Sequence, residues 1–339
     1  MNLDYKNFVY KINLITMKTI KLIIGLFCLL GLTVSAQYYN IDDIVMGIYE
    51  GKWKLGEDSG LLTSQIRPIG DGLYDGFVLL RKDNKDFAVI KVKSQAERDG
   101  IAIVFNGKSD KGIELTGKIQ DGKFSGKLKD QNNSVDFLAL KVVKKSSTLG
   151  EKPPKDAVVL FDGKNTNQFK NFTWKLVEGD AMEVGRGDVF FKGDYKNFKL
   201  HVEFRTPYMP KARGQGRGNS GVYLWSMYEV QVLDSFGIYP LANNDCGAIY
   251  SVKAPDDNAC LPPMEWQTYD IMYNDGDGTP NNPPTITVYH NGVLIHNKVK
   301  IPANMIGKGG AAATPGGGVL KLQDHGNPVQ YRNIWLLPM

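Results

Sequence analysis

Apolar and polar residues alternate over short stretches along most of the chain, and long helical periods are missing. The stretch 228–234 reads Tyr-Glu-Val-Gln-Val-Leu-Asp. Successive side chains of a strand point to opposite faces, so Val230 and Val232 are expected to face a core. Glu229 and Gln231 are then expected to lie side by side on the outer face.

A second polar row follows near the C-terminus, where Lys321, Gln323 and His325 alternate with other residues in a strand-like stretch. Together the two rows would place carboxylate, amide and imidazole groups on one outer sheet face. Such a face is a candidate ligand surface, although polar residues on an exposed face are also commonly just solvated.

A third stretch alternates in the same way. His201, Glu203 and Arg205 share one face of a predicted strand, and apolar residues occupy the other. These charges are compatible with support for a site and equally with a surface ion pair of little energetic value.

The first half of the predicted mature chain, residues 37–145, has the pattern of a small antiparallel barrel or curved sheet. Its strand candidates are 77–80, 87–92 and 101–105. Its expected tight turns are Asp71-Gly72, Asp99-Gly100 and Asp121-Gly122. Aspartate followed by glycine is typical of hairpin turns because both residues tolerate positive φ.

Residues 157–339 are expected to form a second, larger β domain. Its strand candidates are 157–161, 173–177, 199–205, 220–225, 228–233, 269–273, 285–290, 319–323 and 331–336. Many short strands separated by Gly, Asn and Pro turns favour a two-sheet sandwich or jelly roll, and Asn291-Gly292 predicts a hairpin. Residues 146–156, rich in Ser, Gly and Pro, read as a linker. The predicted class is therefore all-β.

Residues 1–36 carry the features of an N-terminal extension and signal peptide. Lys18 and Lys21 precede an apolar run from 22 to 34, and small residues end at Ala36. Cleavage after Ala36 would release an exported protein, periplasmic or secreted, without a membrane span.

The amino-acid composition limits the kinds of partner that the protein is expected to bind. The net charge is +5, but the 41 basic and 36 acidic residues are mixed along the chain, which argues against nucleic acid. Cys246 and Cys260 remain after signal cleavage, and an even number of cysteines in an exported chain makes them a disulfide candidate. Two unpaired buried thiols are the alternative.

Several familiar motifs are absent or out of context. Residues 216–221 match G-x-G-x-x-G, but a strand rather than a helix is expected to follow, which argues against dinucleotide binding. Residues 275–278 lack the glutamate that closes a calcium loop, and no G-x-S-x-G occurs. The four histidines, at 201, 290, 296 and 325, lack the helical H-E-x-x-H spacing, and a metal site assembled from distant residues stays open. No cofactor is required by the sequence, and a divalent cation is compatible with it.

The second half resembles the 3-keto-disaccharide hydrolase domain family. The matching segments are 160–164, 213–223, 228–235, 246–247, 266–270, 290–293, 322–329 and 331–335. The resemblance implies a concanavalin A-like jelly roll, with export and action on glycosides oxidised at C3 of the sugar. Met227 stands where the family often has an arginine, which leaves the substrate preference open.

A ketone at C3 acidifies the proton on C2, so a base can start a β-elimination that expels the aglycone from C1. We assign proton transfer to Glu229 and His325. The second-choice residues, for charge support and enolate stabilisation, are Asp234, Glu203 and Arg332. The candidate sugar contacts are Asn219, Tyr223, Trp225, Gln231 and Gln323.

Two other functions stay open. A lectin-like carbohydrate-binding protein could use the same fold, because a fold does not specify chemistry. A conventional glycosidase needs a carboxylate pair, but Glu229 and Asp234 would lie ~16 Å apart along one strand, which is too far.

Overall fold

The structure is a computed structural model, and it describes residues 43–339 except 100, 277–280 and 303–317. The predicted signal peptide, residues 1–36, lies outside the described residues. Within those residues, no helix is long and apolar enough to cross a membrane. The described part is nearly all strand, which confirms the all-β prediction.

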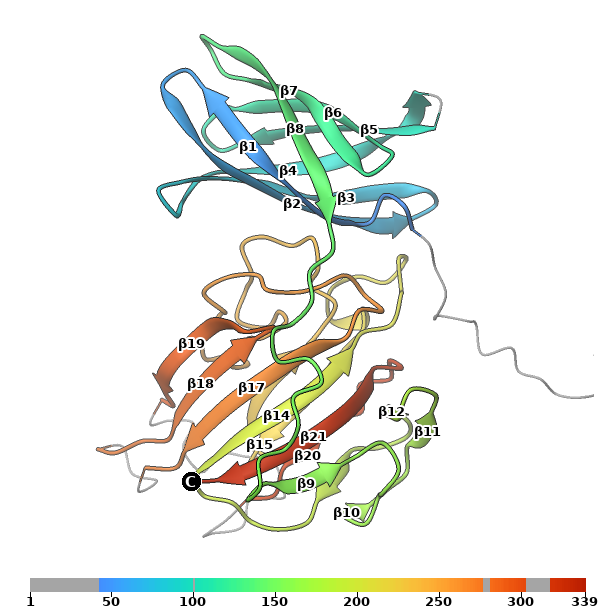
Figure 1. Cartoon of the computed structure of the whole chain (residues 1–339), viewed down its shortest axis with the longest axis vertical. Coiled ribbons are helices and arrows are strands. Elements are labelled where there is room, and N and C mark those ends of the chain that lie inside the picture. Colours follow the sequence, from blue (N-terminus) through green and yellow to red (C-terminus); the bar gives the residue numbers. More distant parts are fainter. Residues whose placement is uncertain (1–42, 100, 277–280, 303–317) are drawn as a thin grey trace, which may run out of the picture. The chain divides into compact units, whose positions relative to one another are not determined.

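The first eight strands close into an antiparallel barrel, in which each strand pairs with the next and β8 pairs back with β1 (Figure 1). The strands are β1 (Gly47–Leu55), β2 (Asp58–Gly70), β3 (Leu73–Lys82), β4 (Lys85–Asp99), β5 (Ala102–Ser109), β6 (Glu114–Gln120), β7 (Lys123–Lys129) and β8 (Ser134–Val142). Closure leaves no free sheet edge in this unit.

The alternation of apolar and polar residues along the strands explains which side chains face the inside of the barrel. In β6, Leu115 and Ile119 are buried while Glu114, Thr116 and Lys118 are exposed, as period-two patterning requires. The predicted turns at 71–72 and 121–122 both have positive φ at their two residues. The third predicted turn, at 99–100, extends outside the described residues.

The remaining strands form a sandwich of two sheets, as predicted for the second domain. The five-stranded sheet has the order β10-β13-β20-β15-β16, with β10 (Phe169–Asn171), β13 (Val189–Phe191), β20 (Lys321–Leu322), β15 (Ser220–Leu224) and β16 (Tyr228–Val232). A short 3₁₀ turn, η1 (Gly214–Gly216), precedes β15.

The larger sheet has eight strands in the order β11-β12-β21-β14-β17-β18-β19, and β9 also pairs with β21. Its strands are β9 (Val158–Phe161), β11 (Lys175–Val177), β12 (Ala181–Glu183), β14 (Phe198–Arg205), β17 (Gln267–Asn274), β18 (Thr285–His290), β19 (Val293–Lys300) and β21 (Gln330–Pro338). The predicted hairpin at Asn291-Gly292 joins β18 to β19, with positive φ at both residues.

One continuous apolar core lies within the sandwich. It receives Val222 and Val230 from the smaller sheet, and Val202 and Tyr269 from the larger one. The predicted inward position of Val230 is therefore confirmed. Glu229 and Gln231, which alternate with the core residues of β16, lie on the opposite face of the smaller sheet.

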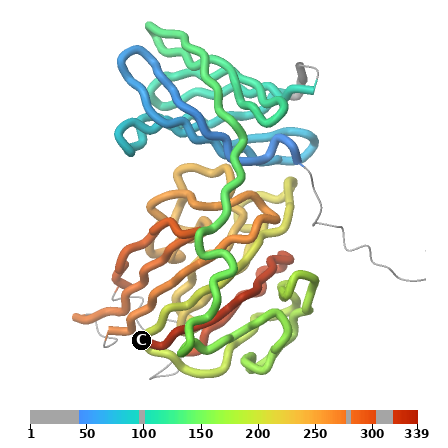
Figure 2. Tube along the Cα trace, viewed as in Figure 1, coloured from blue at the N-terminus to red at the C-terminus, as the bar shows by residue number. Residues whose placement is uncertain are grey.

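The segment between β8 and β9, which contains the predicted linker, is bound to the outer face of the larger sheet (Figure 2). The backbone N–H of Gly150 donates to Glu203, and Thr148 donates to Asp270. Asn333 and Trp335 donate to the carbonyl oxygen of Glu151. This segment therefore covers the strands it crosses.

Candidate functional site

The candidate site lies on the outer face of the five-stranded sheet, where three strands align their polar side chains. Tyr223 of β15 is paired with Glu229 of β16 on one side and with Lys321 of β20 on the other. One step along the sheet, Gly221 is paired with Gln231, and the Gln323 N–H donates to the Gly221 carbonyl. The two predicted polar rows therefore lie on one face, on the two sides of β15.

Glu229 is held by a short chain of hydrogen bonds. Tyr223 Oη donates to Glu229 Oε2 at 2.8 Å, and Gln323 Nε2 donates to Tyr223 Oη at 3.1 Å. The ammonium group of Lys321 lies 3.7 Å from the centre of the Tyr223 ring and forms an ion pair with Asp188 at 2.9 Å. This geometry fixes one carboxylate oxygen of Glu229 and leaves Oε1 for other contacts.

Gly221 makes room for that second oxygen. A Cβ atom at residue 221 would lie 2.2 Å from Glu229 Oε1 and 2.9 Å from the Tyr223 ring. The carboxylate therefore occupies space that any side chain at this position would take. Because Gln231 and Gln323 flank Gly221 on the two neighbouring strands, their side chains border the same space.

Burial sets the electrostatics of Glu229, which is only 7% exposed. Burial raises the pKa of Glu229 from 4.5 to about 7, while the Tyr223 hydrogen bond and the Lys321 charge partly oppose the rise. Burial and the neighbouring carboxylate also raise the pKa of Tyr223, so this hydroxyl stays protonated and donates. A carboxyl with a pKa near 7 can take up or release a proton at neutral pH.

The side-chain amide groups around Glu229 are held in one orientation by hydrogen bonds that their nitrogen atoms donate. Gln231 Nε2 and Asn219 Nδ2 both donate to Gln215 Oε1 at 3.1 Å. Gln323 Nε2 donates to Tyr223, as described above. These bonds direct the amide oxygens elsewhere, and Asn219 Oδ1, Gln231 Oε1 and Gln323 Oε1 are buried without a donor.

Glu229 Oε1 is also buried without a donor, so this face carries four unmet hydrogen-bond acceptors. Among the described residues, four of the seven buried side-chain atoms that have no partner belong to it. A buried acceptor without a donor costs about 1–3 kcal/mol, so the arrangement favours a bound group that brings several donors, such as a polyol.

His325 lies apart from this network. It follows β20 in a loop where Asp324 accepts from the backbone N–H groups of Gly187 and Gly326. The His325 side chain is exposed, whereas Glu229 is buried. The prediction that Lys321, Gln323 and His325 form one row is therefore correct only for the first two, because the Gln323 N–H still pairs with Gly221 whereas His325 lies in the exposed loop beyond it.

Asp234 and Trp225 also lie outside the network. Asp234 accepts from Arg217 Nε at 2.7 Å in a buried ion pair, so its charge is already matched. Trp225 lies in the turn between β15 and β16, donates from Nε1 to the Tyr195 carbonyl and packs against the core. Both residues are held by structural contacts.

Glu203 and Arg332 belong to the other sheet. Arg332 donates to Glu203 at 2.7 Å, and Glu203 also accepts from Asn333 and from the Gly150 N–H. Burial opposes ionisation, but these bonds and a contact with His201 outweigh it and lower the pKa of Glu203 to about 2. The structure does not bring this pair to Glu229, so it corrects the expectation that they support the same site.

His201 lies beside Glu203 under the same segment and is fully buried. Burial lowers its proton affinity, but hydrogen bonds to Asp270 and Glu203 outweigh this effect and raise the pKa of His201. Glu151, His201 and Asp270 place ligand atoms within 4.8 Å of one another, a group that could hold a metal ion. Lys199 pairs with both carboxylates and offsets part of their charge.

Cys246 and Cys260 are free thiols in the structure, and both are buried. The predicted disulfide is therefore not formed here, although the two sulfur atoms lie within 4.8 Å of each other. The alternative of two buried thiols describes this arrangement.

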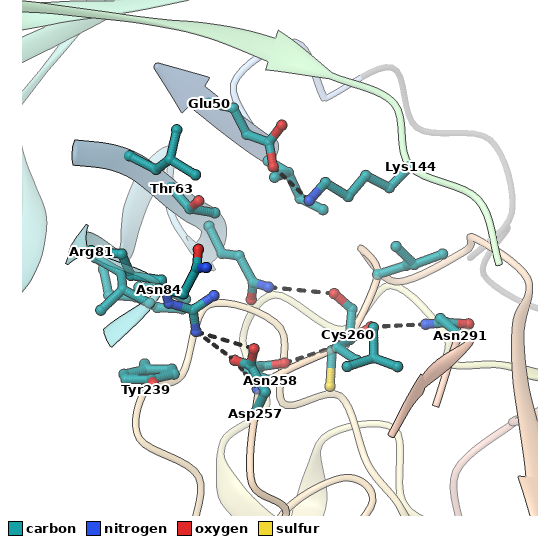
Figure 3. A pocket seen from close by; sticks show the side chains of 18 of the residues that line it. Glu50, Thr63, Arg81, Asn84, Lys144, Tyr239, Asp257, Asn258, Cys260 and Asn291 are labelled. Atoms are coloured by element: carbon teal, nitrogen blue, oxygen red, sulfur yellow. Dashed lines mark hydrogen bonds and ion pairs between the residues drawn. The ribbon is translucent and has the colours of Figure 1, made fainter. Parts of the chain in front are cut away.

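A pocket of about 390 Å³ is lined by residues of the barrel and of the loop that precedes β17 (Figure 3). Four of its charged groups form pairs, Arg81 with Asp257 and Lys144 with Glu50. None of the Glu229 network lines it. The sequence patterns gave no indication of this pocket, because its walls come from segments far apart in the chain.

Sequence reasoning also missed Gly221, Gln215 and Asp188 as parts of the site. The three lie in or beside turns and short strands, where alternation gives little signal. Gly221 was visible as the last glycine of a Gly-rich stretch leading into a strand. Its role depends on the Glu229 side chain of the neighbouring strand, which only the paired sheet reveals.

This chain is similar to solved structures and to a family model. No curated protein matches the chain significantly. Two crystal structures from Parabacteroides distasonis ATCC 8503, each described as a "putative glycosyl hydrolase", are similar. The first has 35% identity, a TM-score of 0.48, and covers 55% of this chain and 84% of its own. The second is 21% identical to this chain, with a TM-score of 0.41. The similarity covers 58% of this chain and 100% of the chain in that structure.

The sequence model of the 3-keto-alpha-glucoside-1,2-lyase-like domain matches residues 156–337, which include both sheets of the sandwich. This match confirms the resemblance drawn from the sequence motifs. It spans more than half of the chain, and the chain therefore belongs to the 3-keto-alpha-glucoside-1,2-lyase-like family, as a carbohydrate-acting enzyme.

Proposed function

We propose that this protein cleaves glycosides that carry a ketone at C3, with Glu229 as the base that removes the proton from C2. The observation that carries the proposal is a buried carboxyl whose pKa is raised to about 7 and whose second oxygen has no donor. Family membership supports the same class of substrate.

The step begins when Glu229 Oε1 takes the C2 proton. The C–H electron pair then forms the C2–C3 double bond of an enolate, and the ketone oxygen becomes negative. When the enolate collapses, its electrons form a C1–C2 double bond and the aglycone leaves C1 with its bonding pair. An acid must protonate the leaving oxygen, and addition of water to the resulting enone completes hydrolysis.

Groups beside Glu229 meet the other requirements of the reaction, which are stabilisation of the enolate and contacts with the sugar hydroxyls. Lys321 brings a positive charge to the face and is proposed to stabilise the enolate oxygen. Tyr223 keeps its proton and donates it to Glu229 Oε2, so it is proposed to position the base. Asn219, Gln231 and Gln323 offer acceptors for sugar hydroxyls. His325 is exposed in the loop that follows Gln323, outside the Glu229 network, and is proposed as the acid for the leaving oxygen.

A lectin-like binding protein is the second candidate, since unmet acceptors serve a bound sugar without any reaction. The raised pKa of Glu229 favours the enzyme, because it lets the carboxyl exchange a proton at neutral pH, which sugar binding alone does not require. We also propose that the protein is exported after cleavage behind Ala36, which mass spectrometry of the mature N-terminus would test.

Product analysis tests the function. The mature protein is incubated with a 3-keto-glucoside and with its unoxidised parent, with and without a chelator. The proposal predicts cleavage of the keto form alone and loss of that cleavage in Glu229→Gln. Binding of the sugar without cleavage of either form would favour the lectin-like protein, and cleavage of the parent would favour a conventional glycosidase. Loss of cleavage with chelator would add a divalent cation to the mechanism.

A further inference from the structure

A second cluster of reactive side chains lies inside the sandwich. Cys246 and Cys260 lie at two places in the long connection between β16 and β17, and His290 is the last residue of β18. Each is at most 2% exposed. One potential ligand atom from each lies within 4.8 Å of the other two, and the structure contains no bond between the sulfurs.

The protonation of His290 follows from its partner. Gln267 Oε1 accepts from the Leu261 N–H at 2.9 Å and from Asn291 Nδ2 at 3.3 Å, which identifies that atom as the oxygen. His290 Nε2 lies 2.9 Å from the same oxygen and must therefore donate to it. The other ring nitrogen, Nδ1, consequently carries the lone pair.

The His290 ring is buried and donates from Nε2 to Gln267. Histidines that bind metals show the same arrangement, in which one ring nitrogen donates to an oxygen and the other binds the ion. Gln267 is itself fixed by two donors, so the ring is held in one orientation.

We propose that Cys246, Cys260 and His290 bind a zinc ion. Two thiolates and an imidazole are soft and borderline ligands that suit Zn²⁺ and exclude Ca²⁺ or Mg²⁺, which require oxygen. Binding releases the two thiol protons, so the complex of two thiolates and Zn²⁺ has no net charge. Neutrality matters because an unbalanced charge in a fully buried site is costly.

Three protein ligands leave one position of a tetrahedral zinc for water or another oxygen. The Tyr269 hydroxyl lies 3.2 Å from Cys246 Sγ and donates to the Gln231 carbonyl at 2.7 Å, so it borders the cluster. A disulfide would use only the two thiols and would leave the orientation of His290 without a role. This is why we prefer a metal to a sulfur–sulfur bond.

The proposed site joins the core to the polar face. The Gly247 N–H donates to the Gln231 carbonyl, which also receives the Tyr269 hydroxyl. Zinc would therefore fix the backbone behind Gln231 without touching a substrate, and its role would be structural. The inference does not depend on the reaction proposed for Glu229.

Metal analysis of the purified mature protein tests the proposal. We expect one zinc per chain, and both thiols should react with an alkylating agent only after denaturation with a chelator. Cobalt added to protein stripped of metal should produce the absorption of thiolate-to-cobalt charge transfer. Gln267→Ala, which removes the acceptor that orients His290 while leaving all three proposed ligands in place, should weaken zinc binding about 10–100-fold.

The matched control is His296→Gln. His296 is also buried and contacts the Gly247 carbonyl, but it is not part of the cluster, so this variant should keep its zinc. Cys260→Ser should lose the metal. If that variant does not fold, the cobalt spectrum of the unaltered protein still decides the question.

Two results would overturn the proposal. One is a chain lighter by two hydrogen atoms with no reactive thiol after denaturation, which would establish a disulfide. The other is two free thiols that fail to bind added zinc or cobalt in the folded protein.

Discussion

Replacing Glu229 with glutamine should make the protein more stable at high pH while it abolishes turnover. Glutamine has the same shape but no charge. Its oxygen can still accept from Tyr223, and its amide nitrogen would take the place of Oε1, which now has no donor. The change therefore removes a buried charge and supplies a donor to neighbouring acceptors.

The magnitude follows from the pKa of Glu229, which rises from 4.5 in the unfolded chain to about 7 in the folded one. Between these values the folded protein binds the proton more tightly, so its stability falls as pH rises through this window. Below pH 4.5 both states are protonated and the effect disappears. Above pH 7 the full cost applies, about 3 kcal/mol at 1.36 kcal/mol for each pKa unit.

Urea unfolding of both proteins at pH 5 and at pH 8 measures this difference. The free energy of unfolding of Glu229→Gln, minus that of the unaltered protein, should grow by about 2.5 kcal/mol between the two values, because a small part of the cost is already present at pH 5. Glu265→Gln, a change at an exposed glutamate, serves as the control for effects of charge elsewhere. A difference that stays constant with pH would refute the assignment of a buried, proton-binding carboxyl.

Activity provides a separate test of the same residue. The unaltered protein should show a kcat/KM that rises with pH through about 7, because the base must be ionised. Glu229→Gln should lose about 10²–10⁴-fold in kcat, the usual contribution of a general base. Full activity in this variant would reject the mechanism even if the stability change were observed.

Three further changes have defined outcomes. Tyr223→Phe removes the hydrogen bond that lowers the pKa of Glu229, so the midpoint of the pH–rate profile should move upward. Gly221→Ala would bring a Cβ within 2.2 Å of Glu229 Oε1, so we expect a fall in kcat and a loss of about 1–3 kcal/mol, measured by turnover and by urea unfolding. Glu203→Ala leaves Arg332 unpaired and should cost about 3–5 kcal/mol at pH 7. Because the pKa of Glu203 is lowered to about 2, this loss should shrink as pH falls from 4.5 towards 2, as thermal melts over that range would record.

The outer polar face could be predicted because alternation is a local property. Glu229 and Gln231 flank Val230, and a strand must place them opposite that residue whatever the rest of the fold does. The turn residues at Asp71-Gly72 and Asn291-Gly292 were equally visible, since positive φ selects a few residue types. The family motifs then identified the sandwich.

Burial and pairing between strands could not be predicted in this way. His201 and Glu203 were correctly expected to face away from the core, but they are buried because residues 148–151 lie over them. The pattern of the strand carries no information about that segment. Similarly, nothing in β20 shows that the strand ends at Leu322 and leaves His325 exposed.

The sequence by itself determined the all-β class, the division into a barrel and a sandwich, and the face on which Glu229 lies, because these depend on alternation and turn chemistry. Only the tertiary structure decided which polar residues act together. It gathered Tyr223, Gly221 and Gln323 around Glu229 and committed Glu203 to a structural contact. Strand order and loop coverage set these distances and the local dielectric environment, and both arise from residues far apart in the chain.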